Sequence, residues 1–260
     1  MKRLCIALAL APLGMWLLWM LAVPEEALLQ ALTERALPAH LELKVQELEK
    51  TPLGLRARSL SIRHKGQRLL IQEPSLWLEP LGLLALQVKL PFRGRLAGGG
   101  LKGTLRASLR GATLKAELKD FRPQELPLLR DWLKGPLTAR AELHLPSLRG
   151  PATLGAEDIL IKGLPIGPVK AKLRGRFLLE GPEELLIEAL SIDAPEFFAR
   201  LRGSIKGGRY ELTLEVMPEE PTGPLAMLLG AHRVSPGYHV LKFRGRLAEA
   251  SFPARPSLLR

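Results

Sequence analysis

A five-residue pattern, apolar–basic–Gly–any–apolar, recurs five times in this sequence and constrains the fold more than any other feature. In a β-strand the first, third and fifth residues of the pattern share one face, which is then apolar with a glycine at its centre. A glycine inside a strand usually marks a bulge, a bend or a close approach to the backbone. The pattern occupies residues 92–96, 101–105, 173–177, 201–205 and 243–247. Its repetition predicts a strongly curved sheet with a crowded apolar side.

Alternation of apolar and polar residues begins at Leu41 and returns along most of the chain. It predicts a hairpin over 101–119 and further strands at 137–145, 169–177, 199–205, 210–216 and 239–247. One apolar and one polar face are typical of antiparallel sheet. Leucines at helical spacing predict short helices near 123–133 and 224–231, able to plug or cap an open end of an apolar groove. We therefore expect a mainly β fold, a curved antiparallel sheet or open β-groove with a few short helices.

The sequence leaves open what covers the apolar face. A second sheet would cover it in a sandwich. Alternatively, the face forms a groove for acyl chains, with room left by the glycines, and such a surface needs a ligand, a lid or a partner. The predicted groove-lining residues are Leu101, Gly103, Leu105, Leu109, Leu173, Gly175, Phe177, Leu201, Gly203, Ile205, Leu241, Phe243, Gly245 and Leu247.

The segment from Leu4 to Val23 contains no charged side chain and follows Lys2 and Arg3. It is long enough to cross the hydrocarbon core, so residues 1–23 are predicted to form a single transmembrane signal-anchor. By the positive-inside rule the N-terminus is cytoplasmic and the remaining chain lies outside the cytoplasm. A cleaved signal peptide is the alternative, although Pro24 makes a poor cleavage site. A juxtamembrane helix over 24–38 and one antiparallel β domain over 39–260 complete the expected organisation.

The residue chemistry argues against catalysis and nucleic-acid binding. The net charge is +12, but Lys and Arg are spread through nearly every predicted strand, which indicates a solvated face, suited also to anionic headgroups. The string Gly98–Gly103 matches a dinucleotide fingerprint, which needs a following helix where the alternation predicts a strand. The five histidines lack metal-site spacing and are expected on the surface. We predict no catalytic, cofactor-binding or metal-binding residues, no cofactor and no enzyme activity.

The order of these features resembles the AsmA-like group of envelope proteins, and within it the type II secretion system protein N family. The likeness is greatest at the C-terminal end, which is similar to that family's helix, Gly-Tyr turn, glycine-bearing strand and proline finish. The segments that carry it are Pro224-Leu225-Ala226-Met227-Leu228-Leu229-Gly230, Pro236-Gly237-Tyr238, Leu241-Lys242-Phe243-Arg244-Gly245-Arg246-Leu247 and Pro253.

The family resemblance implies a non-catalytic accessory or scaffold protein of a type II protein secretion system. Such a protein spans the bacterial inner membrane once, with its N-terminus cytoplasmic and its main domain periplasmic. Its partners would be the inner membrane and other secretion-system or envelope proteins. The wider group implies the alternative, a lipid-binding or lipid-transfer protein that carries acyl chains of phospholipid or another lipid in an apolar β-groove.

Overall fold

The computed structural model describes residues 41–64, 67–80, 87–109, 111–126, 129–162, 164, 167–220 and 229–246. The predicted signal-anchor over 1–23 and the predicted helix over 24–38 lie outside these residues. Within the described part of the chain, no helix is long and apolar enough to cross a membrane. The fold is mainly β and antiparallel, which confirms the class predicted from the alternation.

The chain divides into two compact units, Met1–Arg110 and Gly111–Arg260, called unit 1 and unit 2. In unit 1 each strand pairs antiparallel with the next along the chain. A two-residue turn at Ala97 and Gly98, both with positive φ, leads directly into the last strand. Gly99 to Gly103 already lie within that strand, so the string that matches a dinucleotide fingerprint continues as strand where the fingerprint needs a helix. The strands are β1 (Leu41–Thr51), β2 (Gly54–His64), β3 (Gln67–Trp77), β4 (Gln87–Leu96) and β5 (Gly99–Ser108).

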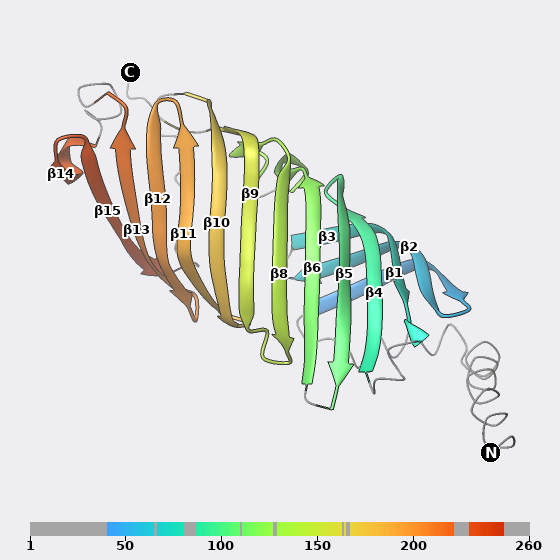
Figure 1. Ribbon diagram of the computed structural model, residues 1–260. Coiled ribbons are helices and arrows are strands. Elements are labelled where there is room, and N and C mark those ends of the chain that lie inside the picture. Colours follow the sequence, from blue (N-terminus) through green and yellow to red (C-terminus); the bar gives the residue numbers. More distant parts are fainter. Residues whose placement is uncertain are drawn as a thin grey trace, which may run out of the picture. The chain divides into compact units, whose positions relative to one another are not determined.

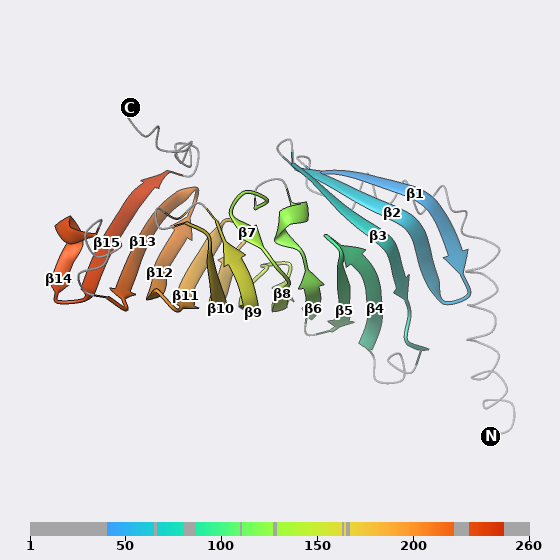
Figure 2. The same ribbon diagram turned by 90° about the horizontal axis from the view of Figure 1, so that it is seen from above.

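Unit 2 is an antiparallel sheet in the order β6-β8-β9-β10-β11-β12-β13-β15-β14, with β7 paired to β9. Figure 1 shows its long strands side by side, and Figure 2 shows them from above in a single row. The strands predicted at 137–145, 169–177, 199–205 and 210–216 lie within β8, β10, β12 and β13, and 239–246 lies within β15. The bounds are β6 (Gly111–Phe121), β7 (Leu133–Lys134), β8 (Leu137–Leu145), β9 (Gly150–Ile161), β10 (Val169–Gly181), β11 (Glu184–Ala194), β12 (Phe197–Lys206), β13 (Arg209–Pro218), β14 (Arg233–Ser235) and β15 (Tyr238–Arg246).

The helices predicted near 123–133 and 224–231 are reduced, in the described residues, to the short 3-10 helices η1 (Pro123–Glu125) and η2 (Gly230–His232). After η1 the chain makes hydrogen-bonded turns and then enters β7. The backbone N–H of Lys162 donates to the carbonyl of Trp132 over 2.7 Å, so the end of the predicted helix is used to pair with β9. Residues 224–228 lie outside the described chain.

Three acidic residues with positive φ shift the phase of the alternation. They are Glu47 in β1 (50°), Glu73 in β3 (48°) and Asp120 in β6 (54°), and all three side chains are exposed. Between Gln72 and Ser75 the pairing of β3 with β4 slips by one residue. A bulge of this kind re-aims the side chains that follow it. The slip in β3, and a similar one between Leu118 and Phe121 in β6, keep Leu76 and Phe121 in line with the apolar residues before them. The pairing of β1 with β2, by contrast, keeps its register on both sides of Glu47.

The best-buried part of unit 2 lies where its connecting segments return onto the sheet. One cluster consists of Val169, Phe197, Ala199 and Val216, and the partly buried Leu164 and Leu229 from two connections pack against it. A second group lies near η1 and β7. Its most deeply buried members are Leu137 at 2 % exposure, Ile159 at 0 % and Pro123 of η1. The core of unit 2 is therefore made by one face of a sheet and by short pieces of chain.

Candidate binding face

Strand register places the apolar residues of unit 2 on one continuous side of the sheet. Residues directly opposite each other in paired strands share a face. Phe177 of β10 lies opposite both Ala152 of β9 and Ile187 of β11, and the same relation continues through Gly203, Leu212 and Phe243 to β15. We call this side, which crosses β6, β8, β9, β10, β11, β12, β13 and β15, the apolar face. The opposite side is called the polar face.

Within these eight strands the apolar face carries no charged side chain at the described positions that share it, and at its border Arg233 of β14 lies opposite His239. Its polar side chains there are Tyr210 and His239. Towards the ends of strands near Val169 and Val216, connecting segments cover it. Towards the opposite ends most of its side chains are only half-buried, and Phe243 is 41 % exposed. In the described residues of unit 2, no second sheet lies over it.

The predicted groove-lining residues are distributed over the two units. Leu173, Gly175, Phe177, Leu201, Gly203, Ile205, Leu241, Phe243 and Gly245 all share the apolar face of unit 2. Leu101, Gly103 and Leu105 share the apolar side of β5 in unit 1, opposite Gly94, Phe92 and Leu90. Leu109 follows the end of β5 and is 92 % exposed. Leu247 lies outside the described residues.

At Gly175 and Gly245, two glycines of the repeated pattern, the space beside the backbone is filled. A Cβ placed on Gly175 would come within 2.6 Å of the Phe177 ring, and one on Gly245 within 2.6 Å of the Tyr210 hydroxyl. A neighbouring side chain thus folds over each glycine, as aromatic residues commonly do in sheets. The gaps at these glycines are already filled by neighbouring side chains. A ligand on this face would therefore lie on top of its half-buried leucines and phenylalanines.

Gly203 is needed for its backbone conformation. Its φ is 144°, and a Cβ there would collide with the carbonyl of Glu211 on β13 and lie 2.8 Å from the Leu212 Cα. Glycine is therefore the residue that permits β12 and β13 to stay paired at this position.

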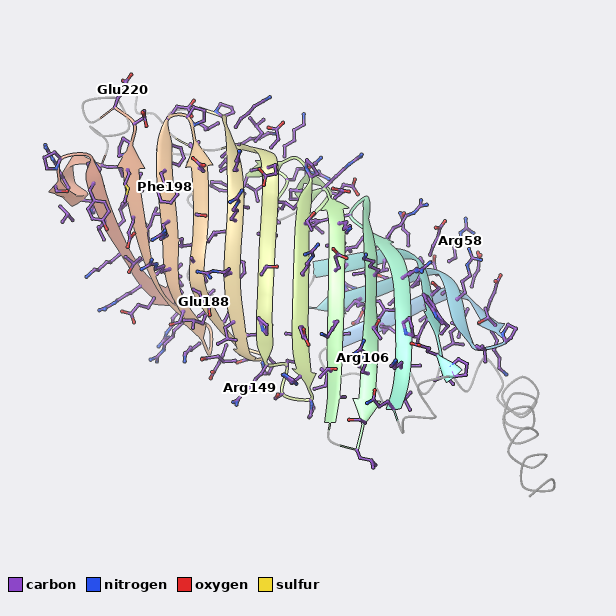
Figure 3. All side chains as sticks on the ribbon, in the orientation of Figure 1. Arg58, Arg106, Arg149, Glu188, Phe198 and Glu220 are labelled. Carbon is purple, nitrogen blue, oxygen red and sulfur yellow. The ribbon has the colours of Figure 1, made fainter. Side chains whose placement is uncertain are left out.

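Ion pairs between neighbouring strands neutralise much of the polar face. Lys115 Nζ lies 2.7 Å from Glu142 Oε1, and Arg140 Nη2 lies 2.9 Å from Glu117 Oε1. A further pair reaches across β11: Lys206 of β12 donates to Glu180 of β10 over 2.9 Å, and this hydrogen bond, followed by the carboxylate charge, raises the pKa of Lys206. Figure 3 shows the side chains projecting from both sides of the strands. These exposed pairs each contribute little to stability, so the polar face is mainly a solvated surface.

His239 was expected on the surface, and this expectation is wrong. The side chain is 2 % exposed on the apolar face, and its Nδ1 lies 2.9 Å from the carbonyl oxygen of Leu229. Its Nε2 is buried without a hydrogen-bond partner among the described residues. The residue is buried because the connection carrying Leu229 folds onto the start of β15. In the alternation of its strand, His239 stands at an apolar position, two residues before Leu241. This position is the sequence feature that could have predicted its burial. His144, by contrast, is exposed as predicted.

Two shallow depressions lie elsewhere in unit 2. The larger, about 510 Å³, is on the polar face around Gly155, with Thr138, Arg140 and Arg174 among its lining residues. The other, about 500 Å³, lies beside Arg149 and Glu180, whose carbonyl oxygen accepts a 2.7 Å hydrogen bond from Arg149 Nε. Arg149 is labelled in Figure 3. In the part of the chain that the structure describes, no group of three or more potential metal ligands comes together.

Comparison of the chain with models of protein families, with curated proteins and with solved structures finds no match.

Proposed function

We propose that the protein is a non-catalytic, membrane-anchored periplasmic protein that binds the acyl chains of phospholipid or another lipid along the apolar face. One observation carries this proposal. An uncharged apolar surface crosses eight strands of unit 2, and the described residues cover only part of it. Exposed apolar surfaces of this extent mark interaction sites in soluble domains.

The chemistry of the face favours hydrocarbon over a protein surface as its occupant. Protein interfaces usually carry about one hydrogen bond per 100–200 Å², and they need donors and acceptors to make them. On this face the polar side chains are Tyr210 and His239, and His239 already contacts the Leu229 carbonyl. Acyl chains require no hydrogen bonds, and their burial contributes about 25 cal/mol per Å² of apolar area. The predicted signal-anchor would hold such a face close to a source of lipid.

Docking to a type II secretion machine is the second candidate function, suggested by the resemblance of the sequence. The structural feature that favours a docking role is the outer edge of β15. Among the described strands, β14 pairs with this edge only at Tyr238 and His239. A strand edge with unpaired backbone groups can accept a strand from another protein.

Replacing Phe243 with glutamate is expected to lower the amount of lipid that co-purifies with the protein. Phe243 is 41 % exposed on the apolar face, and a carboxylate there would have to lose its water for an acyl chain to bind. We expect at least about a tenfold loss of bound lipid, since transfer of an unpaired charge into hydrocarbon is strongly unfavourable. The measurement is native mass spectrometry of the full-length protein extracted gently from its membrane, with the lipids identified.

Met217→Glu is the matched control. Met217 is 40 % exposed but lies on the polar face, where it is opposite Phe198. This variant should retain its lipid at the wild-type level. Equal lipid content in the wild type and in both variants would contradict binding at the apolar face, as would wild-type protein that carries no stoichiometric lipid after detergent exchange.

A further inference from the structure

The outer edge of β15 combines two properties that together specify a partner. After the two residues that pair with β14, the side chains on the polar face of β15 are Val240, Lys242, Arg244 and Arg246. No acidic residue occurs in the strand. On the apolar face the corresponding residues are Leu241, Phe243 and Gly245. The side chains of this edge strand are therefore cationic on the polar face and apolar on the other.

Within both units, cations on one strand are repeatedly matched by glutamates on a neighbouring strand. Arg174 lies 3.4 Å from Glu157, and in unit 1 Arg58 lies 2.7 Å from Glu47. On β15 the inner neighbour β13 supplies such a partner to Arg244, through Glu211. Opposite Lys242, however, β13 presents Thr213.

The residue that β13 presents opposite Arg246 is Arg209, and Arg209 in turn is opposite Lys206 across the β12–β13 hairpin. Like charges directly opposite each other in a sheet are unfavourable. Arg246, Arg209 and Lys206 thus place three cations in a row across β15, β13 and β12, and Lys206 is paired with Glu180.

We propose that the outer edge of β15, from Val240 to Arg246, accepts a strand from a partner protein whose residues alternate between acidic and apolar. The partner's backbone would hydrogen-bond to β15 and its apolar residues would continue the apolar face beside Phe243. Its carboxylates would lie beside Lys242 and the arginines. This inference rests on the docking role and names the chemistry of the partner. It is independent of lipid binding.

The same charges disfavour pairing with a second copy of β15. An antiparallel pair of two such strands would bring the cations of Lys242, Arg244 and Arg246 from both copies together on one face. Charged edges of this kind are a common means of preventing edge-to-edge association. Discrimination between partners then depends on repulsion of cationic strands as much as on attraction of acidic ones.

The test uses the full-length protein in detergent and two fluorescent seven-residue peptides, one alternating glutamate with valine or threonine and one with lysine in place of each glutamate. We expect the acidic peptide to bind at least about tenfold more tightly at low salt, because complementary charge governs partner choice at such a surface. Two further versions of the acidic peptide carry N-methyl groups on alternate amides, one on the odd-numbered and one on the even-numbered residues. The version whose methylated amides face β15 should not bind, since strand pairing uses those backbone N–H groups.

Lys242→Glu should weaken binding of the acidic peptide by about fivefold or more, and it should improve binding of the lysine peptide. Lys170→Glu is the matched control, with the same change of charge at an exposed polar-face position of the interior strand β10. It should leave both affinities unchanged. Equal affinity for the two peptides, insensitivity to N-methylation, or equal effects of the two variants would overturn the inference. Secretion-machine subunits that still co-purify with the Lys242→Glu protein would support docking while placing it away from this edge.

Discussion

Phe197→Ala is expected to lower the free energy of unfolding by about 3–5 kcal/mol, the range found for phenylalanine-to-alanine changes in cores. Phe197 is 6 % exposed and belongs to the cluster of Val169, Ala199 and Val216. Leu164 and Leu229, from two different connections, pack against that cluster. Removal of the ring would therefore leave a cavity between the sheet and the segments that cover it. Urea unfolding of the full-length protein, followed by circular dichroism, measures the change through the shift of the transition midpoint.

The adjacent Phe198 supplies the control for this prediction. Phe198, labelled in Figure 3, lies on the polar face opposite Met217, and its ring is 5.8 Å from the guanidinium carbon of Arg200. Because the ring is only half-buried, Phe198→Ala should cost about 1 kcal/mol, which reflects partial burial and a weak cation–π contact. Similar losses from Phe197→Ala and Phe198→Ala would mean that the cluster at the end of the apolar face is not a core.

Gly203→Ala is expected to destabilise the protein by about 2–4 kcal/mol, since it adds both backbone strain and overpacking. The φ of 144° is rarely adopted by a residue with a Cβ, and the new atom would collide with the backbone of β13. The atoms that the new Cβ would meet are backbone atoms of Glu211 and Leu212, so rotation of a side chain cannot relieve the collision. The same urea titration measures the effect.

Gly181→Ala in β10 serves as the comparison. An added Cβ at Gly181 would meet no atom within 4 Å, and its φ lies outside the region that disfavours side chains. This variant should be neutral, or more stable by a few tenths of a kcal/mol through a less flexible unfolded chain. A neutral result for Gly203→Ala would show that Gly203 of β12 is not paired with Leu212 of β13.

The two faces of the sheet were predictable from the alternation, but the bulges within them were not predicted. In β3 the apolar residues run Leu69 and Ile71, then Pro74 and Leu76, so the spacing between the two pairs is three instead of two. Glu73 lies in the interval and adopts the positive φ that makes the shift possible. Such a spacing is visible in a sequence. It can equally indicate the end of a strand, and pairing with β4 was needed to distinguish the two.

The role of the glycines also depended on pairing partners. The spacing of the repeated pattern predicted correctly that Gly175 and Gly245 share the apolar face with their flanking residues. It could not show that the Phe177 ring and the Tyr210 side chain fold over them. Whether a glycine leaves a gap or receives a neighbouring ring is determined by side chains on the same or an adjacent strand, and those contacts follow from register.

The sequence by itself determined which residues of unit 2 share a face within each uninterrupted stretch of strand, because the direction of side chains alternates there with a period of two whatever the strand pairs with. Across the bulges the pairing of the strands was needed. It also determined the antiparallel class and the chemistry of each face. Only the tertiary structure decided which part of the apolar face is buried, since that depends on where the connections carrying Leu164 and Leu229 return. For the same reason the burial of His239 and the edge position of β15 became known only with the fold. Burial and edges arise from contacts between segments far apart in the chain, which local periodicity does not encode.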